Sequence, residues 1–109
     1  MQSALASENR VFHALADPSR RAIFESLTRG EAAVKDLTAR FDISQPAVSQ
    51  HLAALRDAGL VSSRRVGRLV YYRVEPEGMK PLIDWIEHQR AFWTESVGRL
   101  QKLLNRMDG

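Results

Sequence analysis

The segment SQPAVSQHLAALRDAGL, residues 44–60, carries side chains suited to hydrogen bonding where a solvated helix usually carries charge. At 100° per residue, a helix in this segment places Val48, Leu52 and Leu55 on one face, with His51 at the edge of that face. The other face carries small neutral residues: Pro46, Ser49, Gln50 and Ala53. This pattern predicts an outward helix face that meets a partner through hydrogen bonds.

Glutamine and serine can donate to and accept from base edges in the major groove of DNA, and alanines allow close approach to the groove. We therefore predict that Gln45, Ser49 and Gln50 read bases, and that Ser44 and His51 contact the DNA backbone or act as caps. The alternative is that these residues are merely tolerated on a solvent-exposed surface.

Positive charge is concentrated next to this helix. Residues 58–74 contain four arginines and no acid, so the segment carries +4 in a chain whose net charge is +3. Two runs rich in Val and Tyr flank Gly67-Arg68, a spacing typical of a β-hairpin. We predict that Arg64, Arg65 and Arg68 hold phosphates or enter the minor groove.

Local signals predict the elements that position these residues. A short first helix ends near Ala16, and Asp17-Pro18 begins a second helix that runs to about Arg29, with Gly30 as its C-cap. A third helix over 34–41 is joined by a tight turn to Ser44, the N-cap of a fourth helix that stops at Gly59. Two helices joined so closely indicate a helix-turn-helix.

The segment from residue 78 to residue 107 predicts a long C-terminal helix with an apolar stripe. A small core leaves its aromatic residues in surplus, so we expect them to meet a second copy of the chain together with the first helix, although part of the stripe must pack on its own domain. The predicted interface residues are Leu5, Phe12, Leu15, Trp85, Phe92, Trp93 and Leu100.

Three stretches in order, ALADPSRRAIFESL (14–27), SQPAVSQHLAALRDAGLV (44–61) and RRVGRLVYYRV (64–74), resemble the ArsR/SmtB family of bacterial winged-helix repressors. The resemblance implies a mainly α fold with a small β-hairpin: a winged helix-turn-helix of about five helices and a two-stranded wing. It implies one domain over 1–109, with 78–107 as the dimerisation helix. The expected function is a homodimeric repressor that binds double-stranded DNA at an inverted repeat, with 44–57 as the recognition helix and 64–73 as the wing.

The sequence departs from the metal-sensing members of that family. Where arsenic and cadmium sensors often carry ELCVCDL, this chain has EAAVKDL (31–37), with Ala33 and Lys35 at the two thiolate positions. Asp84 and His88 are four residues apart and could share a helix face, but the matching second pair falls among residues that bind metal poorly. We predict no metal and no cofactor, and a metal-responsive repressor using Asp84 and His88 remains an alternative.

Other classes are disfavoured. The chain has no cysteine, and it shows no Ser, His and acid arrangement and no phosphate-cradling glycine loop, so we expect it not to be an enzyme. It also lacks an apolar run of membrane-spanning length and a signal peptide, which predicts a cytoplasmic protein.

A second alternative is a winged-helix module that binds protein through Trp85, Phe92 and Trp93. The sequence leaves room for an unidentified small-molecule effector.

Overall fold

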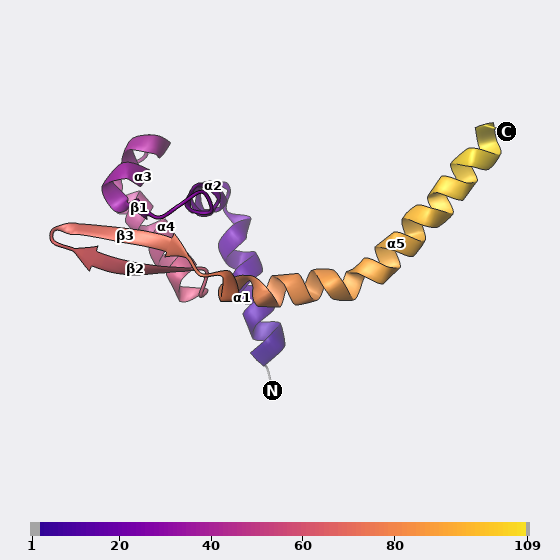
Figure 1. Ribbon diagram of the computed structural model, residues 1–109, viewed down its shortest axis with the longest axis horizontal. Helices are drawn as coiled ribbons and strands as arrows, with labels where there is room; N and C mark the ends of the chain where they lie inside the picture. The colour runs from indigo at the N-terminus through magenta and orange to yellow at the C-terminus, as the bar shows by residue number, and fades with distance from the viewer. Residues whose placement is uncertain (1–2, 109) are drawn as a thin grey trace.

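The computed structural model describes residues 3–108, with side chains from residue 6 onward. Within these residues, five α-helices accompany a small antiparallel sheet (Figure 1). The elements in chain order are α1 (Ser3–Ala16), α2 (Pro18–Leu27), β1 (Ala32–Ala33), α3 (Val34–Phe41), α4 (Gln45–Asp57), β2 (Val61–Val66), β3 (Leu69–Val74), the 3₁₀ turn η1 (Pro76–Met79) and α5 (Lys80–Asp108). The predicted fold class, mainly α with a hairpin, is confirmed.

Side-chain caps begin the two helices that frame the predicted site. The Asp17 carboxylate accepts a hydrogen bond from the Arg20 backbone N–H at 2.9 Å, with Pro18 in the first turn of α2. The Ser44 hydroxyl oxygen likewise accepts one from the Ala47 backbone N–H at 3.2 Å at the start of α4. Each cap satisfies an N–H group that has no partner inside its helix, so both helices start where the sequence predicts.

The end of α2 differs from the prediction. The helix ends at Leu27 and not near Arg29, and Thr28 rather than Gly30 is its C-cap. The Thr28 hydroxyl donates to the Glu25 carbonyl at 2.6 Å. The backbone N–H groups of Arg29 and Gly30 then bond to carbonyls three residues back, Ser26 and Leu27, so the chain leaves the α-helix in a tighter turn before the glycine.

The turn between α3 and α4 depends on one residue in the left-handed region. Asp42 follows the last residue of α3 with φ 51° and ψ 41°. A short polar side chain tolerates this conformation better than most residues do. The chain therefore reverses within three residues, as the helix-turn-helix prediction requires.

The sheet has one strand more than predicted. Its strand order is β1-β3-β2, with Ala32 opposite Tyr72 and Ala33 opposite Tyr71. The hairpin of β2 and β3 turns at Gly67, whose φ of 61° suits a tight two-residue turn. The strand β1, directly before α3, thus pairs with the middle of β3 and holds the hairpin against the helical body.

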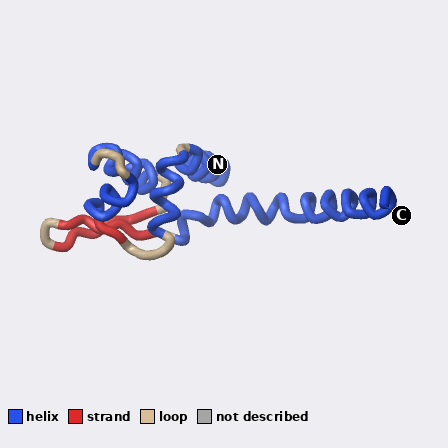
Figure 2. The backbone as a smooth tube through the Cα atoms, turned by 90° about the horizontal axis from the view of Figure 1, so that it is seen from above, coloured by secondary structure: helices blue, strands red, loops and turns tan. Residues whose placement is uncertain are grey.

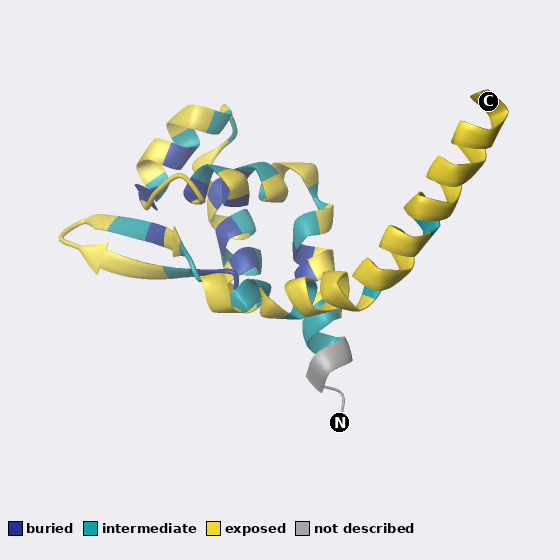
Figure 3. Cartoon of the chain, turned by 45° about the vertical axis from the view of Figure 1, so that its right-hand side comes forward, coloured by how far each residue is buried: buried dark blue, intermediate teal, exposed yellow. Residues whose placement is uncertain are grey.

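Helices α1, α2, α3 and α4 and the sheet share one apolar core. Figure 3 shows its buried residues in the helical body. The largest fully buried side chains are Val11, Ile23, Leu37, Val48, Leu52, Leu55 and Leu60. Three of them belong to α4, so the core fixes the orientation of this helix.

The long helix α5 leaves this body. Its 29 residues span about 43 Å at 1.5 Å per residue, and none of them is buried. The hairpin and α5 extend from the helical body in opposite directions (Figure 2). The radius of gyration is 18.7 Å, whereas a compact domain of this length has roughly 13 Å. None of the described helices combines the length and hydropathy that crossing a bilayer requires.

Candidate nucleic-acid interface

The core holds α4 so that its neutral face points outward. Val48, Leu52 and Leu55 are fully buried. The side chains of Gln45, Ser49 and Gln50 are exposed. All three predicted base-reading residues therefore lie on the solvent side of a helix that the core orients. Whether they contact bases stays a prediction.

The wing arginines separate onto two faces of the hairpin. Successive residues of a strand point to opposite faces. Arg65 pairs with Val70 in the ladder and shares a face with Tyr72, which is 8% exposed. Arg64 pairs with Tyr71 on the opposite face. Arg68 lies in the turn at the tip, beyond both strands.

Arg64 is held by an acid that lies far away in the sequence. Its Nε donates to Glu31 Oε2 at 2.8 Å and its Nη2 donates to Glu31 Oε1 at 2.7 Å. Its guanidinium also lies 5.3 Å from the centroid of the Tyr71 ring. The hydrogen bond from Arg64 lowers the pKa of Glu31 below its ordinary value, and the bond to Glu31 raises the pKa of Arg64. The bidentate pair ties the wing to the segment before β1.

Arg73 is also paired. Its Nε lies 3.4 Å from Glu75 Oε1 and donates to the Ser62 hydroxyl at 3.3 Å. Among the described residues, neither Arg65 nor Arg68 has a carboxylate within ion-pair distance. The four clustered arginines thus reduce to two whose charge is unpaired.

His51 lies on the flank of α4 that faces the start of α2. Its Nδ1 is buried and has no hydrogen-bond partner among the described residues. Its proximity contributes to a lowered pKa of Asp17, whose main cause is the hydrogen bond from the Arg20 backbone N–H. Ser44 acts as a cap, which is one of its two predicted roles. A phosphate contact by His51 stays a prediction.

Asp84 and His88 do not form a side-chain pair. The Asp84 carboxylate accepts from Lys80 Nζ at 2.9 Å, and that bond raises the pKa of Lys80. His88 Nδ1 lies 2.9 Å from the Asp84 backbone carbonyl. Over the part of the chain that the structure describes, no three His, Cys, Asp or Glu side chains cluster in a way that could hold a metal ion.

Five of the seven predicted interface residues are exposed apolar side chains on α1 and α5: Phe12, Trp85, Phe92, Trp93 and Leu100. Phe12 and Trp85 touch edge to face with ring centroids 5.4 Å apart, and Phe92 and Trp93 do so at 5.0 Å. Leu15 packs partly against the core. Trp93 is 57% exposed and Leu100 is 54% exposed. The side chain of Leu5 lies outside the described residues.

Sequence reasoning missed Glu31 as a partner of the wing. Glu31 and Arg64 are 33 positions apart, and the short strand β1 brings them together. A two-alanine strand gives almost no sequence signal, because alanine is not typical of strands. An acid upstream of an arginine-rich hairpin was the only available hint.

Comparison with known proteins gives a consistent result. The profile of a family described as "Bacterial regulatory protein, arsR family" matches residues 17–63. The chain is 38% identical over 103 residues to the HTH-type transcriptional regulator Rv2034 of Mycobacterium tuberculosis, covering 94% of each chain. It is 36% identical to the transcriptional repressor SdpR of Bacillus subtilis over 72% of this chain and 87% of the relative. An ArsR-like transcriptional regulator from Rhodococcus sp. RHA1 has a similar structure, with a TM-score of 0.74 and 30% identity over 93% of this chain and 95% of that one.

Proposed function

Because the chain belongs to the ArsR family of bacterial regulatory proteins and is a DNA-binding transcriptional regulator, not an enzyme, we propose that it is a homodimeric repressor of an inverted-repeat operator. The observation that carries the proposal is the neutral, exposed face of a helix whose opposite face is fully buried. Repression rather than activation is proposed by analogy with relatives that are named repressors.

We assign base reading to Gln45, Ser49 and Gln50, and phosphate contacts to Arg65 and Arg68. Glutamine and serine side chains match base edges, and an unpaired guanidinium suits a phosphate oxygen. Arg64 has a different role in this proposal. Its pair with Glu31 positions the middle of the wing, and a phosphate contact would require that pair to open.

The exposed surface of α1 and α5 supports a dimer. Trp93, Val97, Leu100, Leu104 and Met107 recur at spacings of three and four residues, and each is at least 46% exposed. A contiguous exposed apolar stripe of this kind marks an interaction surface. A second copy of the chain offers the same stripe, so a two-fold axis would cover both at once. Such a dimer would present two recognition helices about one DNA turn apart.

A substitution in the recognition helix tests the base-reading role. We expect Gln50→Ala to relax the preference at one base pair in each half-site by about 1–3 kcal/mol while binding to unrelated duplexes is unchanged. Competition between operator variants, followed by fluorescence anisotropy, measures the preference at each base pair. The control is Arg99→Ala, an exposed residue of α5 outside the recognition helix. If Gln50→Ala weakens binding to every duplex equally, the assignment is wrong.

Two further features belong to the proposal. Action on bacterial DNA implies a cytoplasmic location. The same experiments test the alternative of a winged-helix module that binds protein. A folded monomer with no salt-dependent DNA binding would support that alternative.

A further inference from the structure

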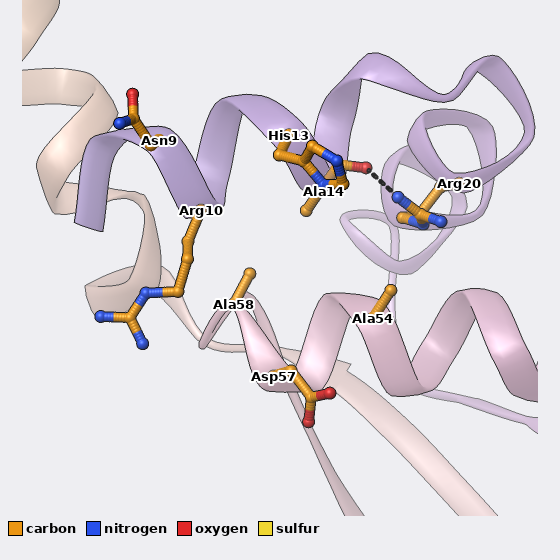
Figure 4. Close-up of a pocket in the computed structure, with 8 residues that line it drawn as sticks. All are labelled: Asn9, Arg10, His13, Ala14, Arg20, Ala54, Asp57 and Ala58. Carbon is orange, nitrogen blue, oxygen red and sulfur yellow. Dashed lines mark hydrogen bonds between the residues drawn. The ribbon is translucent and has the colours of Figure 1, made fainter. Parts of the chain in front are cut away.

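A cavity of about 460 Å³ lies between α1, α2 and α4, beside the flank of α4 that carries Ala54 and Ala58 (Figure 4). This volume falls within the range of small-molecule sites. The cavity uses none of the residues assigned to DNA contact or to the dimer. It is also separate from the space between the terminal helices, where the sequence left room for a ligand.

The floor of the cavity is apolar. Ala14 of α1 and Ala54 and Ala58 of α4 line it. In Figure 4 the methyl groups of Ala54 and Ala58 point from α4 toward α1. Three alanines in a helix-to-helix contact leave a space that larger side chains would fill. A short hydrocarbon group fits such a floor.

The rim of the cavity is basic. Arg10 and Arg20 line it together with His13. Asp57, the one acidic residue of the lining, directs its carboxylate away from α1 (Figure 4). Arg10 has no carboxylate within ion-pair distance among the described residues. In Figure 4 the Arg20 guanidinium lies at one end of the lining and the Arg10 guanidinium at the other, so a positive charge is available at each end.

Arg20 has hydrogen-bonding capacity left over. Its Nη1 donates to the Ala14 carbonyl at 3.3 Å, which holds the guanidinium at the cavity wall. Its Nε is buried and has no partner among the described residues. A buried donor without an acceptor is costly, and such a group in a native structure calls for an explanation. An anion that draws the guanidinium toward the cavity would supply acceptors to it.

We propose that this cavity binds a small organic anion, a monocarboxylate with a short hydrocarbon chain. The carboxylate accepts hydrogen bonds from Arg20, and the exposed Arg10 side chain, drawn at the opposite end of the lining in Figure 4, turns inward to contribute the second positive charge. The hydrocarbon chain lies on Ala14, Ala54 and Ala58. Charge-assisted hydrogen bonds between guanidinium and carboxylate are stronger than neutral ones, so the anion is distinguished from a neutral molecule of equal size.

The position of the cavity couples the anion to DNA binding, a step that rests on the proposed function. Ala54 and Ala58 belong to the same helix as Ser49 and Gln50. An occupant of the cavity therefore contacts the recognition helix directly. If the anion changes DNA affinity by some factor, DNA must change the affinity for the anion by the same factor.

Octanoate and octanamide provide matched probes, because they differ in charge and hardly in size. We expect calorimetry to show octanoate binding to the whole chain, with octanamide at least about tenfold weaker. We expect Arg10→Gln and Arg20→Gln each to weaken the binding of octanoate by a similar factor. Arg10 is exposed and its side chain donates no hydrogen bond to another described residue, so its variant keeps the test valid if Arg20→Gln fails to fold. Arg99→Gln on α5 is the control and should bind as the parent does.

Equal binding of octanoate and octanamide would overturn the proposal, as would the absence of binding at about 10 mM to protein shown to be folded. Methyl NMR locates the bound octanoate. Chemical-shift changes at Ala14, Ala54 and Ala58 support binding in the cavity, and changes confined to the α5 stripe overturn the proposal. The DNA affinity of each variant is measured without octanoate. Absence of DNA binding by the parent chain under the same conditions would count against the proposed function and not against the cavity. Octanoate bound in the cavity with unchanged DNA affinity would overturn the coupling.

Discussion

Replacing the wing arginines one at a time should divide them into two classes. Arg65 and Arg68 have unpaired charges, whereas Arg64 is bound by both carboxylate oxygens of Glu31. We expect Arg65→Gln and Arg68→Gln each to remove one phosphate contact per protomer. Arg64→Gln should leave the number of phosphate contacts unchanged, because its charge is already neutralised by Glu31.

The size of the effect follows from counterion release. Each phosphate contact contributes about 0.9 to the slope of log K against log salt. In a homodimer, Arg68→Gln removes two contacts and should lower the slope by about 1.8. Raising salt from about 50 to about 200 mM would then weaken the parent roughly twelvefold more than the variant. The variant should bind all duplexes more weakly at low salt, without a change of sequence preference.

Fluorescence anisotropy of a labelled duplex over that salt range measures the slope for each variant. Arg99→Gln, on α5, is the control for loss of one charge far from the wing. The reasoning is refuted if Arg64→Gln lowers the slope as much as Arg68→Gln, because Glu31 would then not hold Arg64 in the DNA complex. An unchanged slope for Arg68→Gln would refute the assignment of the wing.

Three other predictions concern stability and assembly. Leu52→Ala, at a fully buried position of α4, should lower the free energy of unfolding by about 2–5 kcal/mol in urea titrations, with exposed Ser49→Ala within about 0.5 kcal/mol of the parent. Because the folded-state pKa of Glu31 lies below its ordinary 4.5, the ionised carboxylate stabilises the fold above that pH and this stability is lost as pH falls; the stability difference between the parent and Glu31→Gln should shrink below about pH 4.5, and a constant difference would contradict the pairing. Trp93→Ala should weaken the dimer by about 30-fold or more in sedimentation equilibrium while circular dichroism is unchanged, and an unaltered dimer would exclude this face.

Local chemistry made most of the fold predictable. The caps at Asp17 and Ser44, the prolines that follow them and the glycine at position 67 each act within a few residues, so their effect can be read in the sequence. The orientation of α4 was predictable for the same reason, because helical periodicity alone separates Val48 and Leu52 from the neutral face.

Contacts between distant residues were not predictable in this way. The chain shows four clustered arginines, but only the pairing of β1 with β3 reveals that Glu31 neutralises one of them. The cavity likewise depends on alanines of α1 and α4 and on Arg20 of α2, residues that are distant in the sequence and leave no periodic signal. Side-chain alternation along the hairpin places Arg64 and Arg65 on opposite faces. The sequence does not show which face meets the core, and the burial of Tyr72 does.

Selection of bound duplexes from a randomised DNA pool tests the central claim most directly. At about 150 mM salt, phosphate binding that ignores sequence is already weakened, so enrichment reports base reading. The account predicts an enriched inverted repeat whose half-sites lie about one helical turn apart. Folded protein that enriches no sequence would contradict the claim that the neutral face of α4 reads DNA.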